Sequence, residues 1–236
     1  MYKNVFFDLD DTLYDFSFNS LQAYKDSFEE MNYERFFENF DTFYEIFQKK
    51  NLELWDLYSL QKISKEELNR IRFSYPLSYV GVDNPVIARE FGRLSLENLS
   101  RRSVLMPYAK EILSYLKPRY NLYILSNGFK ELQFKKMEAS GIDSFFNDII
   151  LSEDINICKP NRAIFEYALK VTNSIRVESI MIGDNYEVDI QGAAGAGIDQ
   201  VYYCNKERLD LPMIPTFYIR SLRELNFFFI RRNNII

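Results

Sequence analysis

Three aspartates and a threonine stand close together near the start of the chain, at Asp8, Asp10, Asp11 and Thr12. They follow a short, mostly apolar run that begins at Asn4 and predicts a buried strand. Carboxylates gathered at one strand end repel one another and lose hydration unless a cation lies among them. Mg²⁺ is the simplest such cation, because it prefers carboxylate and carbonyl oxygens and commonly also binds a substrate phosphate.

Asp8 and Asp10 are two residues apart, and this spacing has a second meaning. Alternate side chains of a strand point to the same side, so both carboxylates face one pocket if the extended geometry persists to Asp10. One of them can then act as a nucleophile and the other as a proton donor. The alternative is an aspartate-rich loop that only caps a helix or a turn. We favour the catalytic interpretation because the acids directly follow an apolar strand.

The lack of histidine excludes several kinds of catalytic site. The chain has 236 residues and no histidine, so Ser-His-Asp and Cys-His catalysis, histidine-bearing zinc sites and a histidine general base are ruled out. Lysines and arginines number 29 against 34 acids, and this balance argues against a basic face for nucleic-acid polymers. A small phosphorylated metabolite needs only one local positive pocket.

Composition also indicates the size class and the compartment. Hydrophobic residues make up 47% of the chain, enough for one α/β domain and a smaller insert. The two cysteines, Cys158 and Cys204, suit a reducing compartment. Cys158 lies beside Lys159 and could be an activated thiol, but we favour a small buried filler. No secretory signal precedes the first strand, and the apolar run 227–230 is too short to span a bilayer. We therefore expect a cytoplasmic protein without a membrane partner.

Residues 15–105 have the character of a helical, aromatic insert. Ser64 and Glu67 have the spacing of a capping box, and Asn84 followed by Pro85 places a cap residue before a proline at the first helical position. The predicted helices are 21–31, 34–49, 64–73 and 86–100. Most aromatic side chains of this region are expected to form a core and not to stack on nucleobases.

Strand and helix patterns alternate from residue 107 onward. Apolar runs predict strands at 121–125, 148–151, 179–182, 200–203 and 217–219, and helices are predicted at 108–116, 130–140, 163–171 and 188–194, with a terminal helix opened at Ser221. This alternation predicts an α/β fold, a Rossmann-like parallel sheet sandwiched by helices. Ligands of such sheets bind beyond the carboxyl ends of the strands.

The second predicted strand ends at Ser126, Asn127 and Gly128. The serine hydroxyl can donate to a phosphate, and the glycine allows a phosphate to approach backbone N–H groups closely. A routine capped turn between strand and helix explains these residues equally well when they are taken alone. Their position at the same sheet edge as Asp8 favours a phosphate cradle.

Lys159 and a pair of acids follow two later strands. A lysine in such a loop is usually solvated, but one beside Asp8 and a phosphate dianion lets the two anions approach each other. Gly183 permits a tight turn, after which Asp184 can bind the metal directly. Asp189 is expected at the start of the next helix, where it holds a metal-bound water or Lys159. The alternative for both acids is helix N-capping, which their convergence on Asp8 makes the weaker account.

The stretch 192–197, Gly-Ala-Ala-Gly-Ala-Gly, superficially suggests a dinucleotide-binding loop. It follows a helix and leads into a strand, which is the reverse of the order that such a loop requires. We expect close packing of this helix on the sheet, and a helix C-cap.

Four of these stretches, in the same order, resemble the four motifs of the haloacid dehalogenase (HAD) superfamily, whose members are mostly Mg²⁺-dependent phosphatases that work through an aspartyl-phosphate. The stretches are residues 8–12, Ser126, Lys159 and residues 183–189. The resemblance implies that Asp8 is the nucleophile and Asp10 the general acid and base. It also implies that Ser126, Asn127 and Lys159 hold the phosphate.

The metal ligands follow from the same resemblance. Mg²⁺ would be bound by the carboxylates of Asp8 and Asp184 and by the carbonyl of Asp10, with Thr12 and Asp189 as supporting residues. The haloalkanoate dehalogenase branch lacks an acid at the position of Asp10 and needs no metal. Phosphoryl chemistry is therefore favoured over dehalogenation.

The resemblance also implies two domains. Residues 1–14 and 106–236 would form the Rossmann-like catalytic core, and residues 15–105 a helical C1 cap, the lid with which the family selects its substrates. A narrower resemblance, to pyrimidine 5′-nucleotidases, rests on residues 126–129, Gln133 and several residues near Lys159 and Asp184. It implies a nucleoside monophosphate as the substrate.

Three functions stay open at this point. The first is a Mg²⁺-dependent phosphomonoester hydrolase, with a pyrimidine 5′-nucleotidase as its narrower form. The second is a phosphomutase of the same superfamily, and the third is a non-catalytic protein that binds phosphorylated ligands on the same scaffold. The full set of acids together with Lys159 favours the hydrolase. The sequence predicts no oligomeric state.

Overall fold

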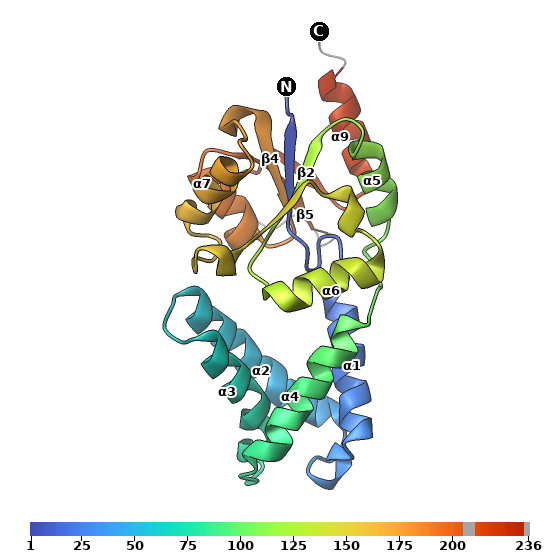
Figure 1. Cartoon of the computed structure of the whole chain (residues 1–236), viewed down its shortest axis with the longest axis vertical. Coiled ribbons are helices and arrows are strands. Elements are labelled where there is room, and N and C mark those ends of the chain that lie inside the picture. Colours follow the sequence, from blue (N-terminus) through green and yellow to red (C-terminus); the bar gives the residue numbers. More distant parts are fainter. Residues whose placement is uncertain (205–210, 234–236) are drawn as a thin grey trace. The chain divides into compact units, whose positions relative to one another are not determined.

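The computed structural model of the protein describes residues 1–204 and 211–233. The chain packs into two compact units, one formed by residues 1–17 and 103–236 and the other by residues 18–102. The first unit is the α/β part of the chain, and the second is helical (Figure 1).

A six-stranded parallel sheet forms the centre of the first unit, with strand order β3-β2-β1-β4-β5-β6. The strands are β1 (Asn4–Phe7), β2 (Asn121–Ser126), β3 (Asp148–Leu151), β4 (Ser179–Gly183), β5 (Asp199–Tyr203) and β6 (Phe217–Ile219). All residues of β1 and β4 are buried, as continuous apolar runs require in a sheet that is covered on both faces. The predicted α/β fold is therefore confirmed.

Helices lie on both sides of these strands, with α7 on one side and α5 and α9 on the other (Figure 1). The helices of this unit are α5 (Ala109–Leu116), α6 (Lys130–Ser140), α7 (Arg162–Val171), α8 (Gly192–Gly195) and α9 (Glu224–Asn233). Phe6, Leu125 and Met181 of the sheet pack against Ile164 and Phe165 of α7 in one buried apolar cluster. This cluster fixes the strands whose ends carry the candidate site.

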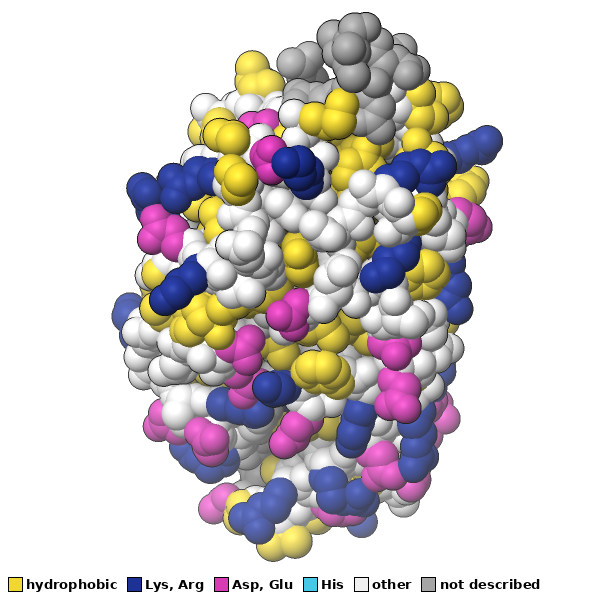
Figure 2. All heavy atoms as spheres, turned by 45° about the horizontal axis from the view of Figure 1, so that its top comes forward, with side chains coloured by type: hydrophobic (Ala, Val, Ile, Leu, Met, Phe, Trp, Pro, Cys, Tyr) yellow, Lys and Arg dark blue, Asp and Glu magenta, His cyan; other side chains and the backbone are white. Residues whose placement is uncertain are grey.

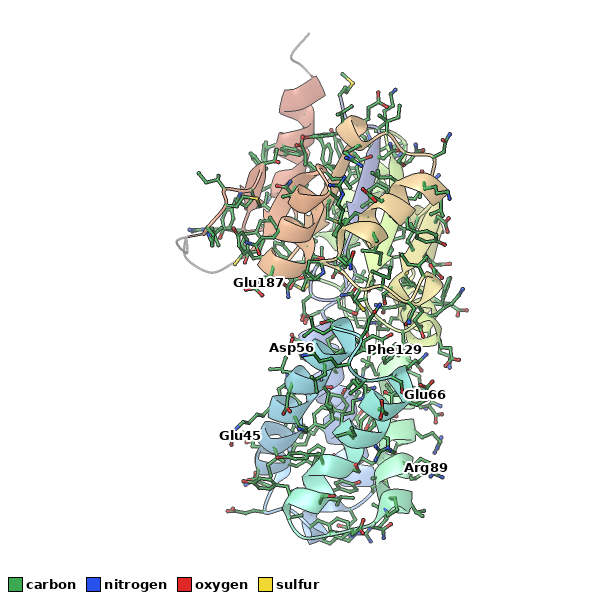
Figure 3. All side chains as sticks on the ribbon, turned by 90° about the vertical axis from the view of Figure 1, so that its left-hand side faces the viewer. Glu45, Asp56, Glu66, Arg89, Phe129 and Glu187 are labelled. Carbon is green, nitrogen blue, oxygen red and sulfur yellow. The ribbon has the colours of Figure 1, made fainter. Side chains whose placement is uncertain are left out.

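The second unit consists mainly of α1 (Phe16–Glu30), α2 (Phe40–Ser59), α3 (Lys65–Tyr79) and α4 (Pro85–Ser100). Its core is aromatic, with Phe28, Phe43, Phe47, Phe73 and Phe91 in one buried cluster, so the aromatic side chains form a core as predicted. Asp56 on α2 and Glu66 on α3 lie at the same end of this unit (Figure 3), as expected for two helices that pack antiparallel across a short connection.

Several helix boundaries differ from the predicted ones. The capping box of Ser64 with Glu67 is present, and so is the cap at Asn84. A helix is present where 34–49 was predicted, but its bounds differ: α2 begins only at Phe40 and continues to Ser59. The side chain of Asn39 accepts from the backbone N–H of Thr42 at 2.9 Å and caps its start. The terminal helix begins at Glu224, not at Ser221.

The glycine-rich stretch packs a helix on its neighbours, as predicted. A Cβ on Gly192 would lie 2.8 Å from the ring of Phe165 and 3.0 Å from the Cα of Pro160. Gly197 has a φ of +72°, and its backbone N–H donates to the carbonyl of Ala194 at 2.8 Å, which is a helix C-cap. The stretch leads into β5 and forms no phosphate loop.

Surface charges of both signs are interspersed on the face shown in Figure 2, where lysines and arginines do not gather into a basic patch. Among the described residues, no helix combines the length and the apolar character needed to cross a bilayer.

Two glycines of this stretch give a matched test of its packing role. We expect Gly192→Ala to destabilise the fold by about 1–3 kcal/mol, since the added methyl group meets Phe165 and a backbone atom. Gly195→Ala has open space around its Cβ and should stabilise by about 0.5–1 kcal/mol through helix propensity. Urea unfolding of both variants measures the difference, and equal effects would contradict the packing role.

Candidate active site

The candidate site lies at the carboxyl ends of three neighbouring strands. β1 lies between β2 and β4, and Phe7 is level with Ile124 and with Ile182. The backbone N–H of Asp8 donates to the carbonyl of Ile182 at 2.9 Å, so the pairing of β1 with β4 continues to the first acid. Phe129, which precedes α6, and Glu187, which follows β4, lie at this same end of the first unit (Figure 3).

Lys159 lies at the centre of the site, with its side chain only 1% exposed. Its Nζ donates to Asp8 Oδ1 at 2.6 Å, to Asp189 Oδ1 at 2.7 Å and to the carbonyl of Leu125 at 2.6 Å. All three ammonium hydrogens therefore have acceptors. Burial alone would lower the pKa of Lys159, but Asp189 and Asp8 outweigh it and raise the pKa above the usual lysine range. The lysine stays charged beside Asp8.

Asn127 fixes the loop that carries this lysine. Its Nδ2 donates to the backbone carbonyl of Lys159 at 2.9 Å, and its Oδ1 accepts from the backbone N–H of Lys159 at 2.8 Å. The loop continues through a cis peptide bond between Lys159 and Pro160. One Nδ2 hydrogen of Asn127 is thus committed to this loop, and its second Nδ2 hydrogen and its backbone N–H are the donors considered for the predicted contact with a phosphate.

Three acids form a group in which each offers one oxygen within 4.8 Å of the others, namely Asp8, Asp184 and Asp189. Burial raises the pKa of Asp184 to about 7, and the neighbouring charge of Asp189 adds to this shift. Burial also raises the pKa of Asp8, against the attraction of Lys159. Thr12 donates to Asp184 Oδ1 at 2.8 Å. Burial is thus the main cause of both shifts, and the neighbouring acids add to them.

Asp189 supports the site through both of its oxygens. Oδ1 accepts from Lys159, and Oδ2 accepts from the backbone N–H of Asn185 at 3.1 Å. A Cβ on Gly183 would lie 2.4 Å from Asp189 Oδ2, so the glycine leaves room for this carboxylate. Asp189 was expected to hold either a metal-bound water or Lys159, and its contacts are those of the second role.

Asp10 lies beyond the end of β1, so the condition that the strand extends to this residue is not met. β1 ends at Phe7, and Asp11 has a φ of +58°, which turns the chain sharply. Asp10 Oδ2 accepts from Gln133 Nε2 at 2.9 Å, and Asp10 Oδ1 forms an ion pair with Lys136. Burial is the main cause of the raised pKa of Asp8, and repulsion by Asp10 makes a smaller contribution.

The hydroxyl of Ser126 accepts two hydrogen bonds at the end of β2. The backbone N–H of Gly128 donates to it at 3.1 Å, and Gln133 Nε2 donates to it at 2.6 Å. A Cβ on Gly128 would lie 1.9 Å from Gln133 Nε2. The glycine was expected to admit a phosphate, and the structure shows that it makes room for Gln133.

Sequence reasoning missed Lys136 as a member of this group. The side chain is buried and pairs with Asp10, yet the residue stands beside Lys135 in a helix with no clear apolar face. The one available signal was its spacing of three residues from Gln133, which places both on the same side of a helix. Burial raises the pKa of the Cys158 thiol, in keeping with a filler and not with an activated thiol.

The chemical potential of the site follows from its charges. Four carboxylates, Asp8, Asp10, Asp184 and Asp189, meet two ammonium groups, Lys136 and Lys159, which leaves a formal excess of two negative charges. The arrangement offers oxygen ligands to a divalent cation. It also offers a nucleophilic carboxylate held beside a charged lysine.

Comparison with known proteins gives a consistent result. Residues 2–197 match the family model of the haloacid dehalogenase-like hydrolases. YfnB of Bacillus subtilis is 30% identical over 228 residues, covering 95% of this chain and 94% of that protein. Its crystal structure, bound to magnesium, superposes with a TM-score of 0.85 at 28% identity and covers 96% of this chain and 98% of that one.

Two further relatives have a more specific description. The pyrimidine 5′-nucleotidase PynA of Streptococcus pneumoniae is 30% identical over 95% of this chain and 93% of its own length. The pyrimidine 5′-nucleotidase YjjG of Escherichia coli is 29% identical over 94% of this chain and 95% of its own length. With the family model matched over most of its length, this chain belongs to the haloacid dehalogenase-like hydrolases.

Proposed function

We propose that this chain is a Mg²⁺-dependent phosphomonoester hydrolase in which Asp8 forms an aspartyl-phosphate. The observation that supports this most directly is the 2.6 Å contact between Lys159 Nζ and Asp8 Oδ1. It places a fixed positive charge on a buried carboxylate, where an incoming phosphate dianion would otherwise be repelled. Ser126, at the next strand end, offers a hydroxyl hydrogen to the same phosphate.

The residues present fit a magnesium ion. We assign the carboxylates of Asp8 and Asp184 and the carbonyl of Asp10 as its ligands, with Thr12 and Asp189 in support. The excess negative charge and the raised pKa values of Asp8 and Asp184 are what a site built around a divalent cation would have without it. When bound, the ion supplies charge neutralisation and orients the phosphate.

In the first step an Asp8 carboxylate oxygen attacks phosphorus, and the bond from phosphorus to the ester oxygen breaks. Protonated Asp10 gives its proton to the leaving oxygen, so an alcohol departs. In the second step Asp10 takes a proton from water, the water oxygen attacks phosphorus, and the bond to Asp8 breaks. Inorganic phosphate is released and both aspartates return to their starting states. Lys159 stays charged throughout.

The substrate assignment rests on the similarity to PynA and YjjG. We propose a nucleoside 5′-monophosphate with a pyrimidine base, and we propose that residues 15–105 are the C1 cap that selects it, on a catalytic core of residues 1–14 and 106–236. Both Cys158 and Cys204 are free thiols, which suits the cytoplasmic location that we also propose.

Phosphate release by purified protein tests the proposal. We expect release that requires Mg²⁺ and favours pyrimidine nucleoside monophosphates over purine nucleotides and sugar phosphates. Asp8→Asn should reduce release to background, because the amide is not a nucleophile, while Lys159 keeps Asp189 and Leu125 as partners and the fold survives. Asp10→Asn should lose about 10²–10⁴-fold.

Asp143→Asn, which removes an exposed carboxylate of the same unit, is the control and should keep full activity. Turnover by Asp8→Asn would overturn the nucleophile. A requirement for a bisphosphorylated activator with little phosphate release would indicate a phosphomutase, and no Mg²⁺-dependent turnover of any ester would indicate a binding protein.

A second prediction concerns how stability depends on pH when a chelator is present, and it follows from the raised pKa of Asp184. Its folded pKa of about 7 exceeds the ordinary value of 3.8, so the folded state binds more protons than the unfolded state between these two pH values. The free energy of unfolding should therefore fall as the pH rises from about 4 to about 7. Asp184→Asn removes this contribution and should flatten the profile.

Urea unfolding at pH 5 and at pH 8, with EDTA and then with Mg²⁺, measures this effect. Mg²⁺ should restore stability to the wild-type protein at the higher pH, and it should do so much less for Asp184→Asn. Parallel pH profiles for the two proteins would contradict the assignment of Asp184 as a buried metal ligand.

A further inference from the structure

Helix α6 directs two buried polar side chains, Gln133 and Lys136, at Asp10, and the proposed reaction steps use neither of them. Gln133 is fully buried and Lys136 is 1% exposed. The two residues are three positions apart, so they lie on the same side of the helix. Lys135, between them in sequence, is exposed, as lysines normally are.

Lys136 is held in this buried place by its charge partner and by two rings. Its Nζ forms the ion pair with Asp10 Oδ1 and lies 5.1 Å from the ring centre of Tyr14 and 5.0 Å from that of Phe16. Burying an ammonium group costs several kcal/mol unless it is paired. Among the described residues, the carboxylate that pairs with Lys136 is that of Asp10. The ion pair with Asp10 therefore accounts for the burial of Lys136.

Gln133 joins Asp10 to the serine at the end of β2. Its Nε2 donates both to Asp10 Oδ2 at 2.9 Å and to Ser126 Oγ at 2.6 Å. The opposite orientation of the amide would place Oε1 against the Asp10 carboxylate, and repulsion between the two oxygens excludes it. In the orientation present, Oε1 is buried without a hydrogen-bond partner among the described residues. The unpaired Oε1 costs free energy of folding, and in return both Nε2 hydrogens donate to Asp10 and Ser126.

The hydrogen bonds to Ser126 decide where its own hydrogen points. The hydroxyl oxygen accepts from Gly128 and from Gln133, and a hydroxyl has two acceptor lone pairs and one hydrogen. With both lone pairs taken, the hydrogen is left for a third partner. Gln133 thus turns Ser126 into a donor, which is what a phosphate oxygen requires.

We propose that Gln133 and Lys136 are positioning residues of this enzyme: together they hold the Asp10 carboxylate in place, and Gln133 in addition orients the Ser126 hydroxyl toward the phosphate. The inference rests on the proposed function. It assigns the two residues separate effects, because Gln133 donates to both Asp10 and Ser126, whereas the ammonium group of Lys136 donates to Asp10 and not to Ser126.

A misplaced Asp10 should matter most when the leaving group needs a proton. p-Nitrophenolate departs from phosphorus without protonation, whereas the alkoxide of a nucleoside or of a simple alkyl phosphate does not. We expect Lys136→Met to lower kcat/KM, which reports the first step alone, by about 10–100-fold for an alkyl phosphate monoester and by less than about 3-fold for p-nitrophenyl phosphate. Lys135→Met removes a charge from the same helix without touching Asp10 and should change neither rate.

A second variant separates the two contacts. Gln133→Leu should show the same dependence on the leaving group, and it should also weaken inhibition by inorganic phosphate, because the Ser126 hydroxyl is released. Lys136→Met should leave phosphate inhibition unchanged. Equal losses of kcat/KM on both esters, or weaker phosphate inhibition in Lys136→Met, would indicate a merely structural role and overturn the assignment.

Crystal structures make the inference independent of turnover. In Lys136→Met the Asp10 carboxylate should leave its wild-type position while Ser126 stays, and in Gln133→Leu both side chains should move. An unmoved Asp10 in both variants would overturn the inference, whatever the enzyme hydrolyses. Absence of ester hydrolysis by the wild-type protein would instead overturn the proposed function, so the two failures are distinguishable.

Discussion

The site depends on one buried ammonium group. Lys159 Nζ binds Asp8, Asp189 and the carbonyl of Leu125, and each of these acceptors comes from a different part of the first unit. Without this charge, Asp8 and Asp189 would be buried anions close to each other, and such a pair is unstable. Most other features of the site either bring Lys159 into place or compensate for the acids that remain unpaired. Asp184 has no ammonium partner among the ion pairs of the described residues, and burial together with the charge of Asp189 raises its pKa.

The parallel sheet explains how residues so distant in sequence meet. β1 is hydrogen-bonded to β2 on one side and to β4 on the other, so three strand ends lie within two strand spacings of one another. The middles of β1, β2 and β4 are buried apolar runs, as expected for strands that are covered on both faces. Polar residues therefore gather where the runs stop, at Asp8, Ser126 and Asp184. The ends of the buried strands therefore determine where the candidate catalytic residues lie.

Much of this was predictable from the sequence, because apolar runs mark strands and the polar residues that follow them mark the sheet edge. Asp8, Lys159 and Asp189 were expected together, and their contacts agree with that expectation. Lys136 was not expected, since a lysine in a mostly polar helix is normally exposed and only tertiary packing buries it. The path of the loop at Asp10 was also missed, because a left-handed Asp11 has no strong sequence signal in a run of acids. The start of α2 was misplaced for a related reason, as only the side-chain cap of Asn39 shows where the helix can begin.

Two glycines show how closely the supporting side chains are fitted. Glycines at strand ends are usually explained by the approach of a ligand, but a Cβ on Gly183 would collide with Asp189, and one on Gly128 would collide with Gln133. In both cases the space is filled by a polar side chain that acts on a reactive residue, Lys159 in the first case and Asp10 in the second. The same arrangement thus occurs at the ends of β4 and β2. In each case a glycine leaves room for a polar side chain, and that side chain holds a charged residue of the site. The positions of Lys159 and Asp10 therefore depend on how Asp189 and Gln133 pack against these glycines, and not on the attraction between charges alone.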